Sequence, residues 1–323
     1  MRVIFMGSPE YAINSLSGLL DSKHQVVAVI TQPDAPKNRG HKLMPCPVKE
    51  FAQKKGIPVY DFIRVSRDGI DTIRELEPDI IITVAYGQIL SSQLLSIPKY
   101  GVINAHASLL PKFRGASPIQ SAIEAGEKTT GVTIMKTETG LDTGDILLVK
   151  TTTIGEEETA GELSDRLSKI SSEAVLSALE LIEKGKLMPK AQNGAEATIC
   201  TKLTKSDSVI NWNHKASQIK CKILSQNPSP VSRTMLGDLQ LKIFRARVAK
   251  GMDNTTEKPG TIIAPTSAKS GVFVQCGQGV LQIVEACLPG GKIMDAKNLV
   301  MSNKIKVGMQ FEPFAFGTKS TEE

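Results

Sequence analysis

Long hydrophobic runs are missing from this sequence. No apolar stretch approaches the roughly 20 residues that a helix needs to cross a bilayer. The first residues, MRVIFMGSPEYAI, also lack the charged, apolar and cleavage regions of a secretory signal. We therefore expect a globular, cytoplasmic protein. The 323 residues, 41% of them hydrophobic, can bury a sizeable core and favour two domains over one.

Paired cysteines, clustered histidines and a dinucleotide-binding fingerprint are also missing. The five cysteines are scattered without a CxxC pair, which favours reduced thiols over disulfides or a zinc site. The four histidines show no ligand spacing such as HExxH, so we expect no metal. The first turn reads Gly7-Ser8-Pro9 instead of GxGxxG, which argues against a nicotinamide enzyme.

Charge is divided unevenly along the chain. Residues 1–205 carry 24 basic and 24 acidic side chains, which leaves 15 basic and 9 acidic ones for residues 206–323 out of totals of 39 and 33. The whole net charge of +6 therefore falls in the last part of the chain. Such an excess is the footprint expected for a polyanionic partner, although an ordinary basic surface would look the same.

The first half of the chain alternates strand-like and helix-like segments, as a parallel βαβ sheet does. Near-continuous apolar strands indicate a doubly wound, mostly parallel sheet that is covered by helices on both faces, which is a Rossmann-like α/β domain. Strands are predicted at residues 2–7, 26–31, 79–85, 101–106, 131–135 and 146–150, and helices at 10–20, 48–55, 118–125 and 160–184.

The second part of the chain follows a different pattern. Residues 186–205 are polar and aperiodic, and we interpret them as a linker between a catalytic domain at 1–185 and a second domain at 206–323. Beyond a helix at 216–224, short strands are predicted at 239–248, 260–264, 271–276 and 280–286. Short strands with Gly/Pro turns suggest a small OB-like β-barrel, a module that often binds nucleic acid.

Open parallel sheets bind ligands at the carboxyl ends of their strands. There the sequence contains Asn104-Ala-His106-Ala-Ser108-Leu109-Leu110-Pro111, then Arg114-Gly115-Ala116, and later Gly140-Leu141-Asp142-Thr143-Gly144-Asp145. These motifs resemble the folate-dependent formyltransferases. Within this family the chain resembles the members that formylate methionine attached to initiator tRNA, because that resemblance covers nearly its whole length. It implies 10-formyltetrahydrofolate as the formyl donor and initiator methionyl-tRNA as the acceptor.

The resemblance implies that Asn104, His106 and Asp142 are the catalytic set, and physical reasoning agrees. Attack of an amine on a formyl carbon makes a negatively charged oxygen, which the Asn104 amide and a protonated His106 could stabilise. Alternation along a strand puts Asn104 and His106 on the same side. Asp142 could stay ionised, favour protonated His106, orient its ring and relay the amine's proton.

Plainer roles exist for the same residues. A lone histidine after a strand is more often structural, and an aspartate in a Gly-rich turn more often forms the turn. Ser108 could suggest nucleophilic catalysis, but that chemistry needs a base within hydrogen-bonding reach and an acyl-enzyme. The family motif favours the catalytic interpretation of Asn104, His106 and Asp142.

Folate contacts are expected in two segments. Ser108, Leu109, Leu110 and Pro111 resemble the folate-binding turn of the family. Ala85, Tyr86 and Gly87 lie in a stretch that we expect to supply backbone hydrogen bonds and apolar walls to the pterin. The leucines would also close the core beneath the loop.

Contacts with tRNA are expected from basic residues in three places. The loop 34–49, kept open by Pro and Gly, corresponds to the family's tRNA-contacting loop, and there we select Arg39 and Lys42. The other candidates are Lys202 and Lys205 in the linker and Arg245 and Arg247 in the barrel, which would position the tRNA by charge. Lys242 should lie on the opposite face of its strand from Arg245 and Arg247.

Two alternatives differ in substrate or in class. The chain could be a formyltransferase for a small amine, which would keep the chemistry without the tRNA. It could also be an RNA-binding protein that kept the fold without activity, since fold alone does not guarantee function. Oligomeric state has no sequence signal, and we expect a monomer.

Overall fold

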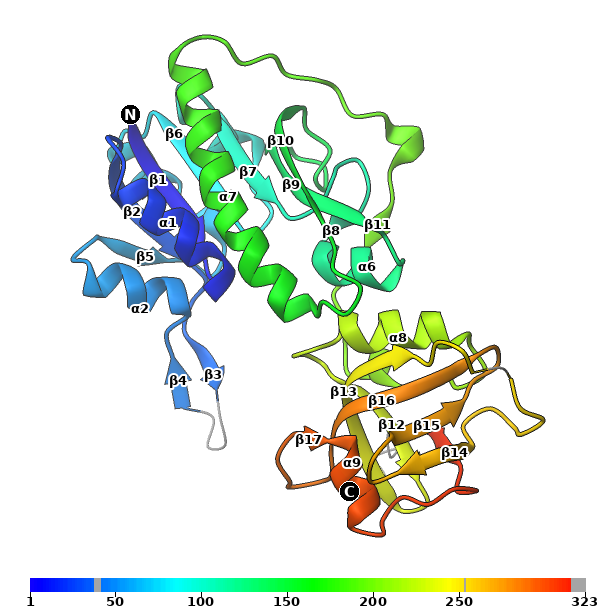
Figure 1. Ribbon diagram of the computed structural model, residues 1–323. Helices are drawn as coiled ribbons and strands as arrows, with labels where there is room; N and C mark the ends of the chain where they lie inside the picture. Colours follow the sequence, from blue (N-terminus) through cyan, green and yellow to red (C-terminus); the bar gives the residue numbers. More distant parts are fainter. Residues whose placement is uncertain (38–41, 253, 315–323) are drawn as a thin grey trace, which may run out of the picture. The chain divides into compact units, whose positions relative to one another are not determined.

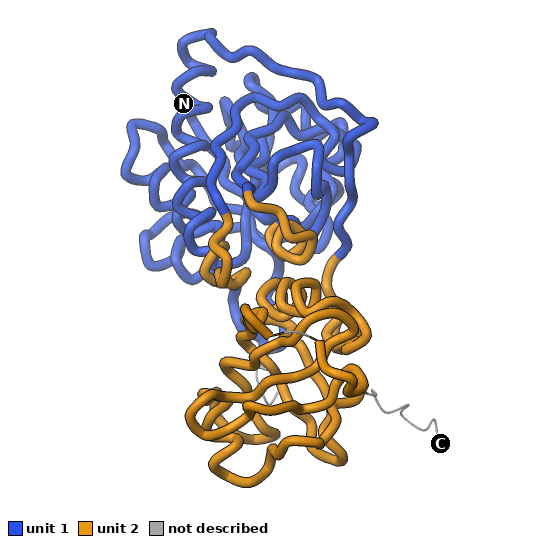
Figure 2. Tube along the Cα trace, turned by 45° about the vertical axis from the view of Figure 1, so that its right-hand side comes forward, with its two compact units in different colours: residues 1–118, 129–153, 164–201 blue, residues 119–128, 154–163, 202–323 orange. Residues whose placement is uncertain are grey.

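A computed structural model describes residues 1–37, 42–252 and 254–314. The chain forms two compact units, which are coloured separately in Figure 2. The first unit contains residues 1–118, 129–153 and 164–201, and the second contains residues 119–128, 154–163 and 202–323. Two short segments from the first half of the sequence therefore belong to the second unit.

The first unit is built on a seven-stranded, mostly parallel sheet (Figure 1). Five neighbouring strands are parallel, while β9 runs antiparallel to β7 and β10 antiparallel to β9. In spatial order the strands are β10 (Ile146–Thr153), β9 (Thr129–Lys136), β7 (Val102–His106), β6 (Ile80–Val84), β1 (Arg2–Gly7), β2 (Gln25–Thr31) and β5 (Val59–Asp61).

Helices cover both faces of this sheet, as its apolar central strands require. The face that carries Ile81 and Val102 packs against α3, α4 and α5. On the other face α1 contacts α7 through the Ser15 and Ser171 hydroxyls, which are 3.1 Å apart. The helices are η1 (Glu10–Ala12), α1 (Ile13–Leu20), α2 (Pro47–Lys54), α3 (Val65–Asp68), α4 (Ile70–Glu75), α5 (Ser92–Leu95), α7 (Ala160–Glu183) and η2 (Gly194–Glu196).

The predicted doubly wound α/β fold is confirmed, and the prediction for residues 2–7 matches β1 to the residue. The prediction missed β5 and the helices α3 to α5, because segments of three to six residues are too short to show a period. The loop at 34–49 was expected to be open. Its ends instead pair as β3 (Ala35–Lys37) and β4 (Lys42–Met44), a two-stranded ribbon that is visible in Figure 1.

The second unit contains a curled antiparallel sheet, which confirms the barrel-like fold expected there. The backbone joins its two end strands: Gly260 accepts a hydrogen bond from Phe311, and Ile262 donates one to Met309 (both N···O 2.8 Å). The strands are, in order, β14 (Ile262–Ser267), β15 (Gly271–Gln275), β16 (Val280–Cys287), β13 (Leu239–Val248), β12 (Ser232–Leu236) and β18 (Phe311–Pro313), and β17 (Met294–Asp295) pairs with β16.

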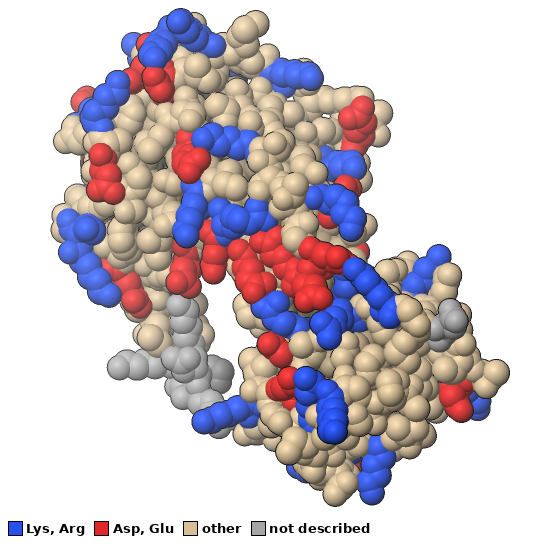
Figure 3. All heavy atoms as spheres, in the orientation of Figure 1, with Lys and Arg blue, Asp and Glu red and all other residues tan. Residues whose placement is uncertain are grey.

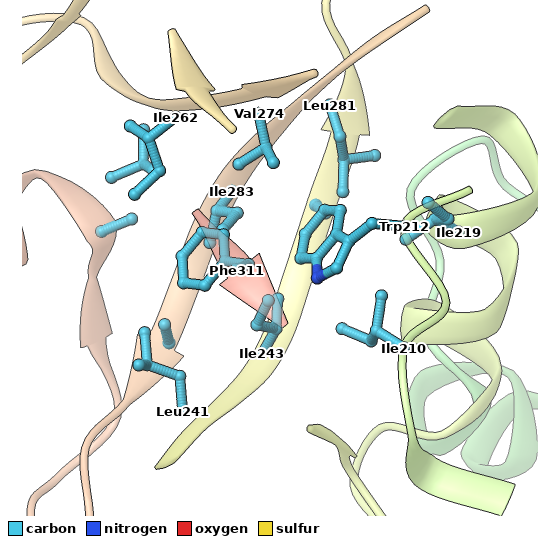
Figure 4. Close-up of a cluster of buried hydrophobic side chains, with 14 of the residues drawn as sticks. Ile210, Trp212, Ile219, Leu241, Ile243, Ile262, Val274, Leu281, Ile283 and Phe311 are labelled. Carbon is cyan, nitrogen blue, oxygen red and sulfur yellow. The ribbon is translucent and has the colours of Figure 1, made fainter. Parts of the chain in front are cut away.

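The inside of the curled sheet is a buried apolar core (Figure 4). The single tryptophan, Trp212, stacks on Phe311 at a centroid distance of 5.3 Å, and its indole N–H donates to the Thr234 hydroxyl (2.9 Å). Helix α8 adds Ile219 to this core. The helical segments assigned wholly or mainly to this unit are α6 (Pro118–Glu124), η3 (Ser206–Ser208), α8 (Ala216–Ser225) and α9 (Ala296–Met301).

A bulge in β13 overturns one prediction about its faces. The pairing of β13 with β16 shifts register on both sides of Arg245. As a result, the buried positions run Leu241, Ile243 and Ala246 instead of alternating throughout. Lys242 therefore lies on the same outer face as Arg245 and Arg247, and the prediction of opposite faces was wrong because it assumed unbroken alternation.

Candidate active site

Three polar side chains meet at the carboxyl end of the central strands of the first unit. Asn104 and His106 belong to β7, and Asp142 lies in the turn between β9 and β10. The Asn104 amide nitrogen lies 3.4 Å from Asp142 Oδ1, and His106 Nδ1 lies 3.6 Å from Asp142 Oδ2. The structure thus brings the amide and the imidazole of one strand together with a carboxylate that lies 38 positions from Asn104 in the chain.

The neighbouring strand fixes the orientation of the Asn104 amide. Thr83 of β6 pairs in register with Asn104, and its hydroxyl donates to Asn104 Oδ1 at 3.0 Å. The amide oxygen is therefore an acceptor within the protein, which turns the NH₂ group toward Asp142. One N–H of that group bonds to the carboxylate, and the second has no acceptor among the described residues, so it can donate to another partner.

The His106 ring is buried and held on two sides. Its Nε2 lies 2.8 Å from the carbonyl oxygen of Phe113, so Nε2 carries a proton and donates it. Nδ1 faces the carboxylate of Asp142. In this conformation the Nε2–H is directed at the protein, and it reaches a substrate oxygen only after leaving Phe113.

The Asp142 carboxylate is held in a strained turn. The backbone N–H of Gly115 donates to Asp142 Oδ2 at 2.8 Å. Of the six non-glycine residues with positive φ in the described chain, three lie around this site: Ala85 (47°), Phe113 (58°) and Asp142 (50°). Such strained residues cluster at functional sites because the surrounding structure must hold them in place.

The turn expected to bind folate follows β7 directly. Ser108 is fully buried, and its hydroxyl donates to the Lys112 carbonyl oxygen at 2.7 Å. The Leu110 N–H donates to the Thr133 hydroxyl of β9. Leu110 is buried, while Leu109 and Pro111 are half-buried. Ser108 thus closes the turn itself, and the leucines partly fulfil the packing role considered above.

The second expected folate segment, residues 85–87, begins where β6 ends. Thr83, two positions before Ala85, pairs with Asn104 of the neighbouring parallel strand, so the segment begins close to the end of β7. Ala85 and Gly87 are exposed, whereas Tyr86 is buried in the core and burial raises the pKa of its hydroxyl. Gln32 donates to the Tyr86 carbonyl oxygen at 2.8 Å. The exposed backbone of this segment therefore lies beside the three polar groups.

The ribbon expected to contact tRNA is only partly described. Arg39 lies outside the described residues, and so does the Lys42 side chain. Lys49, at the base of the ribbon, contacts Asp34 (2.7 Å) and Asp61 (2.6 Å), and these hydrogen bonds raise the pKa of its ammonium. Lys49 thus links Asp34, directly before β3, to Asp61 at the end of β5 in the sheet.

The four other basic candidates lie in the second unit and differ in their surroundings. Lys202 and Lys205 are exposed. Arg247 is exposed and donates to the Gln282 amide oxygen at 2.7 Å. The Arg245 guanidinium contacts the Glu162 carboxylate, Glu285 (3.4 Å) and the Glu157 carbonyl oxygen (3.2 Å). Arg245 and Arg247 are therefore not equivalent, although they are neighbours on one face.

The two folded units carry equal net charge, although the charge is unevenly distributed along the chain. Residues 119–128, 154–163 and 202–205 join the second unit and bring three basic and six acidic side chains, so this unit has 18 basic and 15 acidic ones. The first unit keeps 21 and 18, so each unit carries +3 of the total +6. In Figure 3 acidic side chains gather near the start of α7. Glu162 of that helix pairs with Arg245.

Two residues around the site were missed by sequence reasoning. Thr83 is a polar residue inside the apolar run DIIITVA, and that contrast is the signal that could have revealed it. Gln192 lies in the polar, aperiodic segment interpreted as a linker, where no pattern distinguishes it. Its side chain bonds to the Asp142 turn and to Arg114. Only the contacts reveal its position.

A doubly wound domain with this polar group at its strand ends, followed by a small curled sheet, defines a class of transferase. The family model described as formyl transferase matches residues 1–179, and the model of the formyl transferase C-terminal domain matches residues 202–304. Since these matches cover well over half of the chain, the protein belongs to the formyl transferase family.

Curated relatives extend the match to nearly the full length of both chains. The methionyl-tRNA formyltransferase of Alkaliphilus metalliredigens is 44% identical over 96% of this chain and 98% of its own. That of Marinobacter nauticus is 43% identical over 94% and 97%. The predicted membership of the family is confirmed.

Solved structures share the fold. An N-formyltransferase from Helicobacter canadensis, in complex with folinic acid and dTDP-3-aminofucose, superposes with a TM-score of 0.65 at 17% identity, covering 88% of this chain and 98% of its own. Methionyl-tRNA formyltransferase from Clostridium thermocellum gives 0.56 at 21% identity, covering 78% and 95%. In the described residues, no helix is both long and apolar enough to cross a membrane.

Proposed function

We propose that this chain transfers a formyl group from 10-formyltetrahydrofolate to the amino group of methionine carried by initiator tRNA. The observation that carries the proposal is the meeting of Asn104, His106 and Asp142 at the strand ends of a chain that matches methionyl-tRNA formyltransferases over nearly its full length. The product would serve in the initiation of translation.

The reaction needs an uncharged amine and a stabilised oxyanion. The amine lone pair attacks the formyl carbon, and the π electrons of its carbonyl move to oxygen. The amine then loses one proton, the carbon–nitrogen bond to the folate breaks, and the folate nitrogen takes up a proton. Donors aimed at the negative oxygen lower the barrier of the attack.

The three side chains can divide this work. The free N–H of Asn104 is pre-oriented, because Thr83 holds its amide oxygen. His106 can add a second donor to the oxyanion once its ring leaves Phe113. Asp142, which contacts both, orients the His106 ring and accepts the proton lost by the amine on its way to the leaving nitrogen.

The folate is expected beside these groups. Residues 85–87 and 108–111 follow β6 and β7, which pair through Thr83 and Asn104, so both segments border the same end of the sheet. A flat heterocycle fits an apolar slot edged by a few polar groups. The exposed backbone of Ala85 and Gly87 supplies such edges, and the turn that Ser108 closes supplies apolar side chains.

The second unit is proposed to hold the tRNA. Lys202, Lys205 and Arg247 are exposed and basic, as phosphate contacts require. Arg39 and Lys42 remain proposed contacts from the ribbon, and Arg245 would first have to leave Glu162. We further propose a catalytic domain at 1–185, a linker at 186–205 and a tRNA-binding domain at 206–323, in a monomeric, cytoplasmic enzyme.

The test is a transfer assay with purified protein, aminoacylated initiator tRNA and the folate donor. We expect formyl-methionyl-tRNA from the wild type and about 10²–10³-fold less from His106→Ala. A dTDP-aminosugar serves as the competing acceptor. Formylation of the sugar but not of methionyl-tRNA would establish the small-amine alternative, and tRNA binding without any transfer would indicate an inactive RNA-binding protein.

A further inference from the structure

The segment between the two family-model matches contains Gln192, whose side chain contacts two loops of the candidate site. Residues 180–201 fall outside both models. Within them, both side-chain N–H bonds of Gln192 are used: Nε2 donates to the carbonyl oxygens of Asp142 (2.8 Å) and Gly144 (2.7 Å). Its Oε1 accepts from Arg114 Nε (3.1 Å) and Nη2 (2.8 Å). Its hydrogen-bonding groups are thus all engaged.

This arrangement permits only one orientation of the amide. Turned around, the oxygen of Gln192 would face two carbonyl oxygens, and its NH₂ group would face the guanidinium of Arg114. Both contacts would be repulsive. Gln192 is therefore a specific connector between the Asp142 turn and the loop that carries Arg114.

Of the two loops that Gln192 connects, one carries Asp142 and the other contacts the Asp142 carboxylate. Arg114 directly precedes Gly115, whose N–H donates to the Asp142 carboxylate. A Cβ on Gly115 (φ 117°) would overlap the carbonyl oxygen of Cys200, which shows how tightly the loop lies on the segment after Gln192. Most of the Asp142 turn is exposed, so these hydrogen bonds replace the packing that a core would give.

We propose that Gln192 is a positioning residue for the formyl transfer, acting through Asp142 and Arg114 without touching either substrate. The inference deepens the proposed function and rests on it. A displaced Asp142 would no longer align with Asn104 and His106, and misplacement of about 1 Å costs roughly 10²-fold in rate. The loss should appear in kcat, because Gln192 is assigned no substrate contact.

The first test is kinetic. Gln192→Leu should lower kcat for methionyl-tRNA by about 10²-fold with both KM values within about twofold of wild type. Gln192→Glu keeps the acceptor for Arg114 and removes both donors, and it should show the same loss. The matched control is Asn193→Ala, since the exposed Asn193 side chain bonds only to Glu196 and to the Ala195 N–H among the hydrogen bonds described. This control should retain wild-type kcat.

The second test needs no substrate. The Gly115 amide proton is bonded to the Asp142 carboxylate, whereas the Arg114 and Ala116 amides donate to Thr198 and Cys200 (2.8 and 3.0 Å). In Gln192→Leu and Gln192→Glu, hydrogen exchange measured by NMR should accelerate at Gly115 and stay unchanged at Arg114 and Ala116. Asp142→Ala is the positive control.

Two results would overturn the proposal. One is wild-type kcat in both Gln192 variants. The other is equal acceleration at all three amides, which would mean that Gln192 only supports the local fold. If the wild type itself fails to formylate methionyl-tRNA, the proposed function fails, while the exchange experiment still decides whether Gln192 positions Asp142.

Discussion

In the first unit, Asn104 and His106 each contact Asp142, and one amide N–H of Asn104 has no acceptor among the described residues. In the second unit, the basic side chain of Arg245 contacts Glu162 and Glu285. The ion pairs of Arg245 use its charge within the protein, whereas the contacts of Asp142 arrange polar groups that can act on a substrate. The comparison teaches that residue type alone does not indicate function: what a side chain already binds decides what it can still do.

The largest effect is expected from the candidate catalytic group. His106→Ala, Asn104→Ala or Asp142→Asn should lower kcat/KM for methionyl-tRNA by about 10²–10³-fold, or about 2.7–4 kcal/mol, because each removes or misorients a group that stabilises the transition state. Steady-state kinetics with both substrates varied will measure the loss. His214→Ala is the control, because His214 is exposed in the second unit. Losses below tenfold in all three variants would end the assignment.

The next effect concerns the stability of the second unit alone. Phe311→Ala removes the ring that stacks on Trp212, and the cavity should cost about 3–5 kcal/mol of unfolding free energy. Trp212 is the only tryptophan, so its fluorescence during urea unfolding reports on this unit. Leu239→Ala, at an exposed position at the start of β13, is the control and should change stability little. An unchanged midpoint for Phe311→Ala would contradict the packing described.

A comparison of two neighbouring arginines should give a smaller effect. Arg247→Ala should weaken tRNA binding and reduce the slope of log K against log salt by about one, because an exposed arginine is available to a phosphate. Arg245→Ala should leave that slope unchanged, since its partners are Glu162 and Glu285. Binding titrations at several salt concentrations will separate the two. The reverse order would show that tRNA displaces Glu162.

The smallest effect is the pH dependence of the pair formed by Glu162 and Arg245. Burial of Glu162 opposes ionisation, but hydrogen bonds from Arg245 and Thr159 outweigh it and lower its pKa below the usual 4.5. The stabilisation is therefore present above about pH 4.5 and is lost as the pH falls through the lower folded-state value. Because Glu162 is half exposed, Glu162→Gln should cost only about 0.2–1 kcal/mol at pH 7.

Urea unfolding followed by Trp212 fluorescence at pH 7 and pH 3 will measure this difference. The gap between wild type and Glu162→Gln should shrink as the pH falls from 7 to 3, because protonation of Glu162 removes the charge that glutamine lacks. Glu156→Gln is the control, because its pair with Lys250 is longer (3.5 Å) and more exposed. A gap that is equal at both pH values would exclude an ionic origin.

Much of the fold could be predicted because its signals are local. The apolar strands β1 and β6 and the strands β13 to β16 of the second unit follow from the sequence pattern, whereas β12, β17 and β18 were not predicted. Asn104 and His106 are two residues apart on a strand, so their shared face was predictable from alternation. The bulge at Arg245 was not predictable, because a register shift depends on the partner strand.

The sequence by itself determined the alternating elements, the placement of Asn104 and His106 on one face of β7, and the motifs that indicate the family. Each of these signals lies within one short stretch of chain. Tertiary structure alone decided that Asp142 meets them, that Gln192 holds its turn, and that Glu162 pairs with Arg245. The physical reason is that hydrogen bonds and ion pairs act over a few ångströms in space, while their partners here are 38, 50 and 83 positions apart along the chain.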